Sequence, residues 1–482
     1  MQLKSAHLIA CFVLLKLAVP TVAAQDTRLA DAAKRQDTET IRTLLKLPVN
    51  VNSPLGDGST ALHWAAHWND LETADLLIRT GANVNAATDL GITPLYLAAI
   101  NGNAPMVEKL VGAHANPNLR ASTGVSPLMA AARTGSLKAV QALLAGGSDV
   151  NVHENSQNQT ALMWAVAQCH PEVVQALIDH GANVHARTKS TRMLVVRGDM
   201  AQVPNDSSID TTETGGTTPL LFAARVGDIE SAKILIEGGA SVNETAADGN
   251  SALVIAMHSG HGPFAAFLLE RGANPNADGD GYTALHAAVL RDDLNIVKAL
   301  LAHKADPNKP MLKATPIRRN GPDVFLPASL VGATPLLLAA KYASIEMIRA
   351  MIASGADVRV ATKDGTTPLI AAAGADREGR GGKSAGAVPE QQSREVVQLL
   401  TELGADVNAT NSAGDTAVHL AASKSFNSVI QLLADAGAKL DVKNKRGQTP
   451  LMIASARVRR APAAQATVDL LRKLTTSAGS IQ

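Results

Sequence analysis

Two histidines four residues apart are the residues of this chain best placed for metal chemistry. His63 and His67 fall in a stretch whose apolar spacing predicts a helix, so both lie on one face and could supply two ligands. A protein-held metal needs at least a third ligand, and none follows from the sequence. Because His63 also occupies a position in a repeated motif, a structural hydrogen bond explains it better. We therefore predict no metal site.

Two segments resemble a phosphate-binding loop and a calcium-binding loop, but each lacks one residue that binding requires. Residues 379–384 end in Gly-Gly-Lys-Ser, as a phosphate-binding loop does, but Arg377 stands where that loop needs its first glycine. Residues 274–279 begin as a calcium loop does, but its twelfth position is Leu285 in place of a glutamate. No Ser/His/Asp arrangement and no carboxylate pair calls for catalysis. The sequence thus predicts no catalytic residue, no enzyme activity and no cofactor.

Composition favours thin packing layers over one deep core. Of the 482 residues 46% are hydrophobic, yet only 2% are aromatic. Alanine, leucine and valine supply most of the apolar surface, which suits closely spaced helices. The formal net charge is +1, and removal of residues 1–24 would make it −1 because Lys4 and Lys16 are lost. This balance argues against a nucleic acid as the partner.

The N-terminus predicts a secretory signal peptide cleaved after about Ala24. Lys4 precedes an apolar run over 8–19, and small residues follow at 22–24. That run is shorter than the roughly 20 residues of a transmembrane helix, so we predict no transmembrane segment. An uncleaved anchor is one alternative, and lipidation of Cys11 is another that we favour less. The predicted location is periplasmic or secreted.

A seven-residue motif, Thr-Ala-Leu-His-Trp-Ala-Ala at 60–66, recurs along the chain. Related segments begin at Thr93, Ser126, Thr160 and further anchors up to Thr449, and the basic spacing is 33 residues. Period and motif resemble the ankyrin repeat, and the resemblance extends from about Thr27 to about Leu474. It implies an all-α solenoid of about twelve helix-pair units with β-hairpin-like loops and three insertions.

The residues of each unit agree with this fold on physical grounds. The anchor Thr or Ser can cap a helix, and a proline directly after it tolerates the missing N–H. Paired alanines let helices approach closely. A Gly-Ala step then ends the second helix, since glycine adopts the left-handed conformation of a C-cap. We expect a capping repeat at 25–57, full repeats over 58–446, and a capping repeat with a polar tail at 447–482.

Three insertions interrupt the period, near 185–216, 309–332 and 375–392. The first two lie between units and combine strand-like apolar residues with cations, so we expect them to form two fingers that contact a partner. The third splits a helix pair, is rich in glycine and reads as a flexible spacer. The predicted partner-binding residues of the fingers are Arg192, Arg197, Arg318, Arg319 and Phe325.

The resemblance implies that partners bind to the hairpin tips and the exposed side of each first helix. The two residues after each Ala-Ala pair would lie on that side, and no carboxylate occurs among them. This row predicts a moderately basic groove for an acidic peptide or protein surface, although an ordinary solvated face would look similar. Trp68 would be an exposed anchor, while Trp64 and Trp164 would serve packing. The partner-binding residues predicted in this row are His67, Trp68, Arg133, Arg225, Arg291, Lys341, Tyr342 and Lys424.

Together these observations predict a non-catalytic protein-interaction scaffold of the cell envelope. It would bind another protein through the concave groove and the two fingers. The alternative is a structural or assembly subunit of a larger envelope complex. An enzyme whose insertions build a site is a third and less favoured class. The partner and the oligomeric state do not follow from the sequence.

Overall fold

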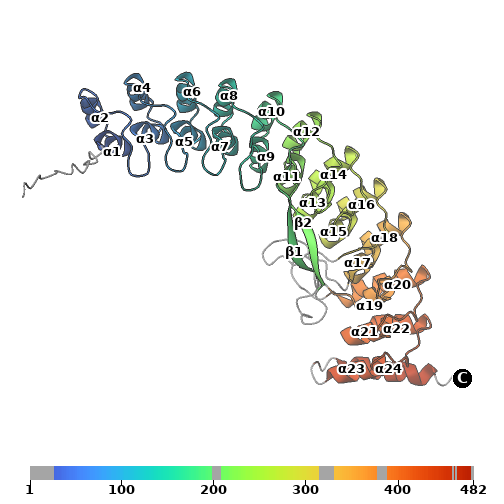
Figure 1. Ribbon diagram of the computed structural model, residues 1–482. Coiled ribbons are helices and arrows are strands. Elements are labelled where there is room, and N and C mark those ends of the chain that lie inside the picture. The colour runs from blue at the N-terminus through green and yellow to red at the C-terminus, as the bar shows by residue number, and fades with distance from the viewer. Residues whose placement is uncertain are drawn as a thin grey trace, which may run out of the picture.

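The computed structural model describes residues 26–197, 208–313, 330–376, 388–458, 461 and 464–478. Its helices pair in chain order, and the pairs stack into one long arc (Figure 1). The first helix of each pair lies on the inner side of the arc and the second on the outer side. We number the pairs as units 1 to 12, from α1–α2 to α23–α24. The predicted ankyrin-type solenoid of about twelve helix pairs is confirmed.

The bounds of the helices repeat with little variation. The first helices are α1 (Arg28–Lys34), α3 (Ala61–His67), α5 (Pro94–Ile100), α7 (Pro127–Thr134), α9 (Ala161–Ala167), α11 (Pro219–Val226), α13 (Ala252–Ser259), α15 (Ala284–Leu290), α17 (Pro335–Lys341), α19 (Pro368–Ala373), α21 (Ala417–Lys424) and α23 (Pro450–Val458). The second helices are α2 (Thr38–Leu44), α4 (Leu71–Arg79), α6 (Ala104–Gly112), α8 (Leu137–Ala145), α10 (Pro171–Asp179), α12 (Ile229–Glu237), α14 (Gly262–Glu270), α16 (Leu294–Ala302), α18 (Ile345–Ala353), α20 (Glu390–Glu402), α22 (Asn427–Asp435) and α24 (Ala464–Ala478).

The anchor residue of the motif caps the first helix, as expected. In α17 the hydroxyl of Thr334 accepts from the Leu337 N–H at 3.2 Å, and Pro335 follows at the first helical position. In α3 the cap is reciprocal. His63 Nδ1 accepts from the Thr60 N–H at 3.0 Å, while its Nε2 lies 2.9 Å from the Ile92 carbonyl of the next hairpin. His63 is therefore a buried link between units, which confirms the structural assignment made from the motif.

Small residues set the spacing between neighbouring units. Ala65, Ala66, Ala98 and Ala99 are fully or almost fully buried, so consecutive first helices pack through alanine faces. Leucines of the second helices, such as Leu143, fill the space behind them. Each unit thus covers the apolar face of the next, and a continuous core extends along the array without becoming thicker.

The first insertion forms a two-stranded hairpin, β1 (Thr191–Arg197) and β2 (Ser208–Thr214). The strands are antiparallel and pair Thr191 with Thr214 and Leu194 with Thr211. Figure 1 shows the hairpin leaving the array beside α11, on the inner side of the arc. Met193 is 50% and Leu194 73% exposed, so this part of the finger presents apolar side chains to solvent.

Several predictions concern parts of the chain outside the described residues. These include the signal peptide, Cys11, and the finger residues Arg318, Arg319 and Phe325; Arg197 is described only in its backbone. The third insertion does separate the two helices of unit 10, α19 and α20, as expected. Among the helices that the structure describes, none is long and apolar enough to cross a membrane.

Candidate functional site

Aromatic rings and a lysine gather on the inner side of units 1 to 3. The His67 ring lies 4.6 Å from Trp68 and 5.8 Å from Trp64, both edge-on. Lys34 Nζ from unit 1 lies 5.1 Å from the Trp64 ring. Trp68 is 44% exposed, and Asn101 Nδ2 donates to the His67 carbonyl at 3.0 Å. A large exposed ring held by its neighbours is a suitable binding anchor.

Two further cations lie over half-exposed rings farther along the same face. Arg133 Cζ is 5.8 Å from the Trp164 ring, and Arg225 Cζ is 6.0 Å from the Phe222 ring. Both arginines are exposed, whereas Trp164 and Phe222 are partly buried against the core. A ring face beneath a guanidinium orients its charge outward at little conformational cost.

The next unit holds the backbone of each of these arginines. His170 Nε2 donates to the Arg133 carbonyl at 3.3 Å, and His261 Nε2 donates to the Arg225 carbonyl at 3.0 Å. Each imidazole covers a left-handed glycine, since a Cβ on Gly135 would meet the His170 ring at 2.5 Å. The glycine therefore has two roles, the positive φ and the close approach of the next unit.

Three of the predicted groove residues are engaged within the protein. The Arg291 guanidinium is half-buried and donates from Nη2 to the His258 carbonyl. Lys341 Nζ forms an ion pair with Asp376 Oδ1, and Lys424 Nζ lies 3.4 Å from Asp376 Oδ2. Their polar groups therefore contact other parts of this chain.

Tyr342 is not on the surface, in contrast to the sequence-based expectation. It is only 1% exposed, while the homologous Trp68 of unit 2 is open. Residue 342 follows α17, and its ring packs into the core near Lys341, whose Nζ is 5.6 Å from the ring. The residue types within one unit do not show whether the neighbouring units will bury a given side chain.

Asp376 places a carboxylate beside a row of residues in which the sequence predicted none. The predicted row contains no carboxylate, but Asp376 follows α19 at the start of the third insertion and reaches two lysines of that row. Burial acts to raise the pKa of Asp376, but the charges and hydrogen bonds of Lys341 and Lys424 hold that pKa below its usual value. In the sequence, the only signal for a role of Asp376 is its position at the start of the third insertion.

Sequence reasoning also missed Phe222 and assigned Trp64 and Trp164 to packing alone. All three occupy the fourth position after the anchor and lie beneath a cation on the inner face. Because all three large rings share this position in the repeat, the sequence could have indicated that they form one row. In the parts of the chain that the structure covers, no three His, Cys, Asp or Glu side chains are grouped to hold a metal ion.

Stacked helix pairs with a ring-and-cation inner face define a helical-repeat protein with a groove. A sequence model described as "Ankyrin repeats (3 copies)" matches residues 29–121, 95–188, 196–279, 220–311 and 386–473, and one described as "Ankyrin repeat" matches 331–363. The chain belongs to the ankyrin-repeat family. Such repeats generally mediate protein–protein interaction, and proteins built from them are typically non-enzymatic scaffolds.

Two curated proteins are similar over part of their length. "Ankyrin repeat and SOCS box protein 6" of Homo sapiens and that of Pongo abelii are each 34% identical over 135 residues, which is 28% of this chain and 26% of theirs. The chain thus spans about a quarter of these relatives. Among solved structures, the human ASB11 ankyrin repeat domain is 26% identical with a TM-score of 0.41, over 51% of this chain and 98% of that one.

Proposed function

We propose that the protein is a non-catalytic scaffold that binds an acidic partner protein on the inner face of units 1 to 6. The observation that carries this is the row of three cation–ring pairs, Lys34 with Trp64, Arg133 with Trp164, and Arg225 with Phe222. Rings supply desolvated contact area and the cations supply attraction for carboxylates. Trp68, exposed beside this row, adds a further anchor.

The hairpin β1–β2 extends this proposed surface. It leaves the array just before α11 of unit 6, on the inner side of the arc (Figure 1). A two-stranded hairpin is marginally stable in water by itself. Exposed Met193 and Leu194 would gain burial from a partner that lies in the groove. The finger would therefore close over one side of the bound protein.

Reversing two groove charges tests the proposal. With a photo-crosslinking residue at position 100, which is exposed on α5, R133E/R225E should yield about tenfold less crosslinked partner than the wild type, because two attractions become repulsions. Arg291 is left unchanged because its guanidinium holds the His258 carbonyl. The measurement is the yield of adduct in the native compartment.

A matched double reversal on the outer helices controls for net charge. Lys138 and Lys298 are exposed on α8 and α16, so K138E/K298E should leave the adduct unchanged. Thermal unfolding followed by circular dichroism should be the same for both doubles. Equal adduct from R133E/R225E and wild type would refute binding in this groove.

We further propose that the chain acts in the cell envelope after export. This rests on Lys4, the apolar run at 8–19 and the small residues at 22–24. N-terminal sequencing of the protein from its native source should give Gln25 as the first residue. A mature chain that starts at Met1 would contradict export by cleavage.

A further inference from the structure

At the base of most inter-unit hairpins, an asparagine bridges to the next hairpin. Its Oδ1 accepts the backbone N–H of a residue in the following unit at 2.6–2.8 Å. Asn308, for example, accepts from Asp357 N–H and donates from Nδ2 to the Gly355 carbonyl at 2.9 Å. The bridging residues are Asn52, Asn85, Asn118, Asn151, Asn243, Asn276, Asn308 and Asn408.

Two positions of this series carry another residue. At the joint of units 5 and 6 it is His185, whose Nδ1 lies 2.8 Å from Glu244 Oε1 of the next hairpin, and Arg187 Nη1 donates to the Thr245 carbonyl at 2.8 Å. Other contacts thus replace the bridge there. At the joint of units 9 and 10 it is Arg359, which turns back to Asp357 of its own hairpin, with Nε 3.0 Å from Oδ1.

The joint of units 9 and 10 keeps its contacts on the inner side. At the hairpin tips the Ser412 N–H donates to the Asp364 carbonyl at 2.5 Å. Asp376 of unit 10 bridges Lys341 of unit 9 and Lys424 of unit 11, and its N–H donates to the Lys341 carbonyl at 3.1 Å. The tips and this carboxylate therefore hold the inner edge together.

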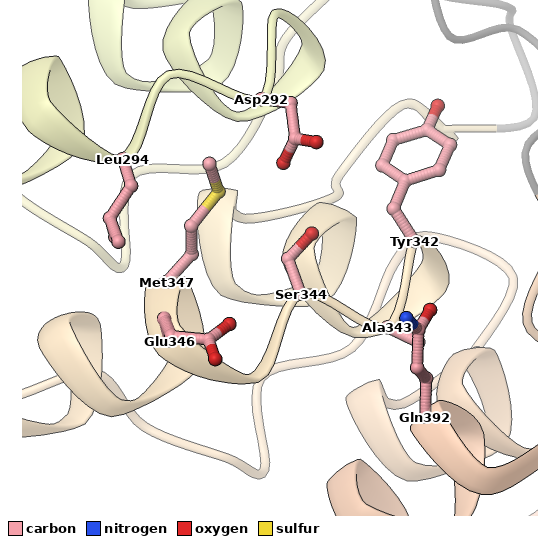
Figure 2. Close-up of a pocket in the computed structure, with 8 residues that line it drawn as sticks. All are labelled: Asp292, Leu294, Tyr342, Ala343, Ser344, Glu346, Met347 and Gln392. Carbon is pink, nitrogen blue, oxygen red and sulfur yellow. The ribbon is translucent and has the colours of Figure 1, made fainter.

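Beside this joint, a pocket lies where the helices of units 8 and 9 turn back. A cavity of about 250 Å³ lies there, lined by Asp292, Leu294, Tyr342, Ala343, Ser344, Glu346, Met347 and Gln392. These residues come from units 8, 9 and 10. Figure 2 shows Asp292, Ser344 and Met347 directed toward one space, with Gln392 of α20 at its border. Only Gln392 belongs to unit 10, so the pocket lies mainly between units 8 and 9 and borders the joint of units 9 and 10.

We propose that the joint of units 9 and 10 is a hinge, about which units 10 to 12 swing relative to units 1 to 9. The stability of a repeat array is approximately a sum of unit and interface contributions, so an interface that lacks one of its hydrogen bonds opens more readily. Here the asparagine bridge on the outer side is lost, and the inner side is held by Asp376. The hinge axis lies along the tips.

This arrangement fixes the direction of motion. Because the tips stay joined and the hairpin bases are free to separate, the outer side opens and the arc curves more tightly. The last three units then approach the inner face and the finger. Asp376 acts as a latch, since a carboxylate that competes for Lys341 and Lys424 would release it.

Amide hydrogen exchange tests the hinge residue by residue. The Asp406 N–H occupies the place of the Lys439 N–H, which donates to Asn408 Oδ1 at 2.8 Å. We expect Asp406 to exchange on the order of tenfold faster than Lys439, because about one net hydrogen bond of protection is missing. R359N should slow exchange at Asp406 by a similar factor. N276A, which removes an existing bridge, should accelerate exchange at Asp306.

Distances between spin labels test the motion itself, in a C11S/C169S background of the full chain. Labels at 298 and 435 span units 8 to 11 across the joint, and labels at 237 and 349 span units 6 to 9 within the longer arm. The first distribution should be the broader, should narrow in R359N and should widen in D376N. A first distribution no broader than the second, or exchange at Asp406 as slow as at Lys439, overturns the proposal. Unchanged exchange in both R359N and N276A overturns the role of the asparagine bridges.

Discussion

Lowering the pH from 7 to 4 should reduce the free energy of unfolding by about 3 kcal/mol through His286 alone. Burial lowers the pKa of His286 from an ordinary 6.5 to about 4. Its Nδ1 accepts from the Thr283 N–H at 3.1 Å, and its Nε2 donates to the Ala333 carbonyl at 3.2 Å. A proton on Nδ1 would face an N–H donor, so the folded protein excludes it.

The sign follows from the proton balance. Between pH 6.5 and 4 the unfolded chain binds a proton at His286 that the folded chain does not, so acid favours unfolding over this range. Above pH 6.5 both states are neutral and the effect vanishes. Urea unfolding at several pH values gives the measurement, and H286Q serves as the comparison. If wild type and H286Q lose stability in parallel as the pH falls, His286 is not the responsible group.

Replacing Gly279 by alanine should destabilise the array by about 2 kcal/mol, because its side chain would collide with backbone. A Cβ at this position would lie 1.9 Å from the Gly249 carbonyl oxygen and 2.5 Å from Gly249 Cα. Gly249 is itself in a left-handed conformation with φ +85°. Two hairpin tips meet there through glycine alone, so neither can move aside without disturbing its own unit.

Gly56 is the matched control for this substitution. It also lies in a hairpin between units, yet a Cβ added to it would have no atom within 4 Å. G56A should be neutral or slightly stabilising, because alanine restricts the unfolded chain more than glycine does. The midpoints of urea unfolding for G279A and G56A give the comparison. Equal midpoints would show that the two tips do not need this close approach.

The helix pairs were predictable because the residues that cap and end each helix act within their own unit. Thr283 caps a helix and His286 completes the cap whatever the neighbouring units contain. The Gly-Ala ends are equally local, whereas the alanine pairs pack between consecutive first helices. The strand-like residues of the first insertion were likewise sufficient to anticipate the hairpin β1–β2.

The proposed binding face was predictable only in part. Arg133 and Arg225 are exposed as expected, since they end a first helix on the inner side. The rings beneath them come from Trp164 of the following unit and Phe222 of the same unit, a combination that no single motif specifies. Tyr342, by contrast, was predicted to be exposed, but its side chain packs into the core.

The amino-acid sequence by itself therefore determined the repeating unit, its number and the places where the period is interrupted, because those depend on contacts within about 33 residues. Tertiary structure decided which cations stay exposed and which pair with other units. Asp376 neutralises lysines from units 9 and 11, and Arg359 leaves one joint without its asparagine bridge. Such interactions join residues of different units, and their geometry exists only after the units have stacked.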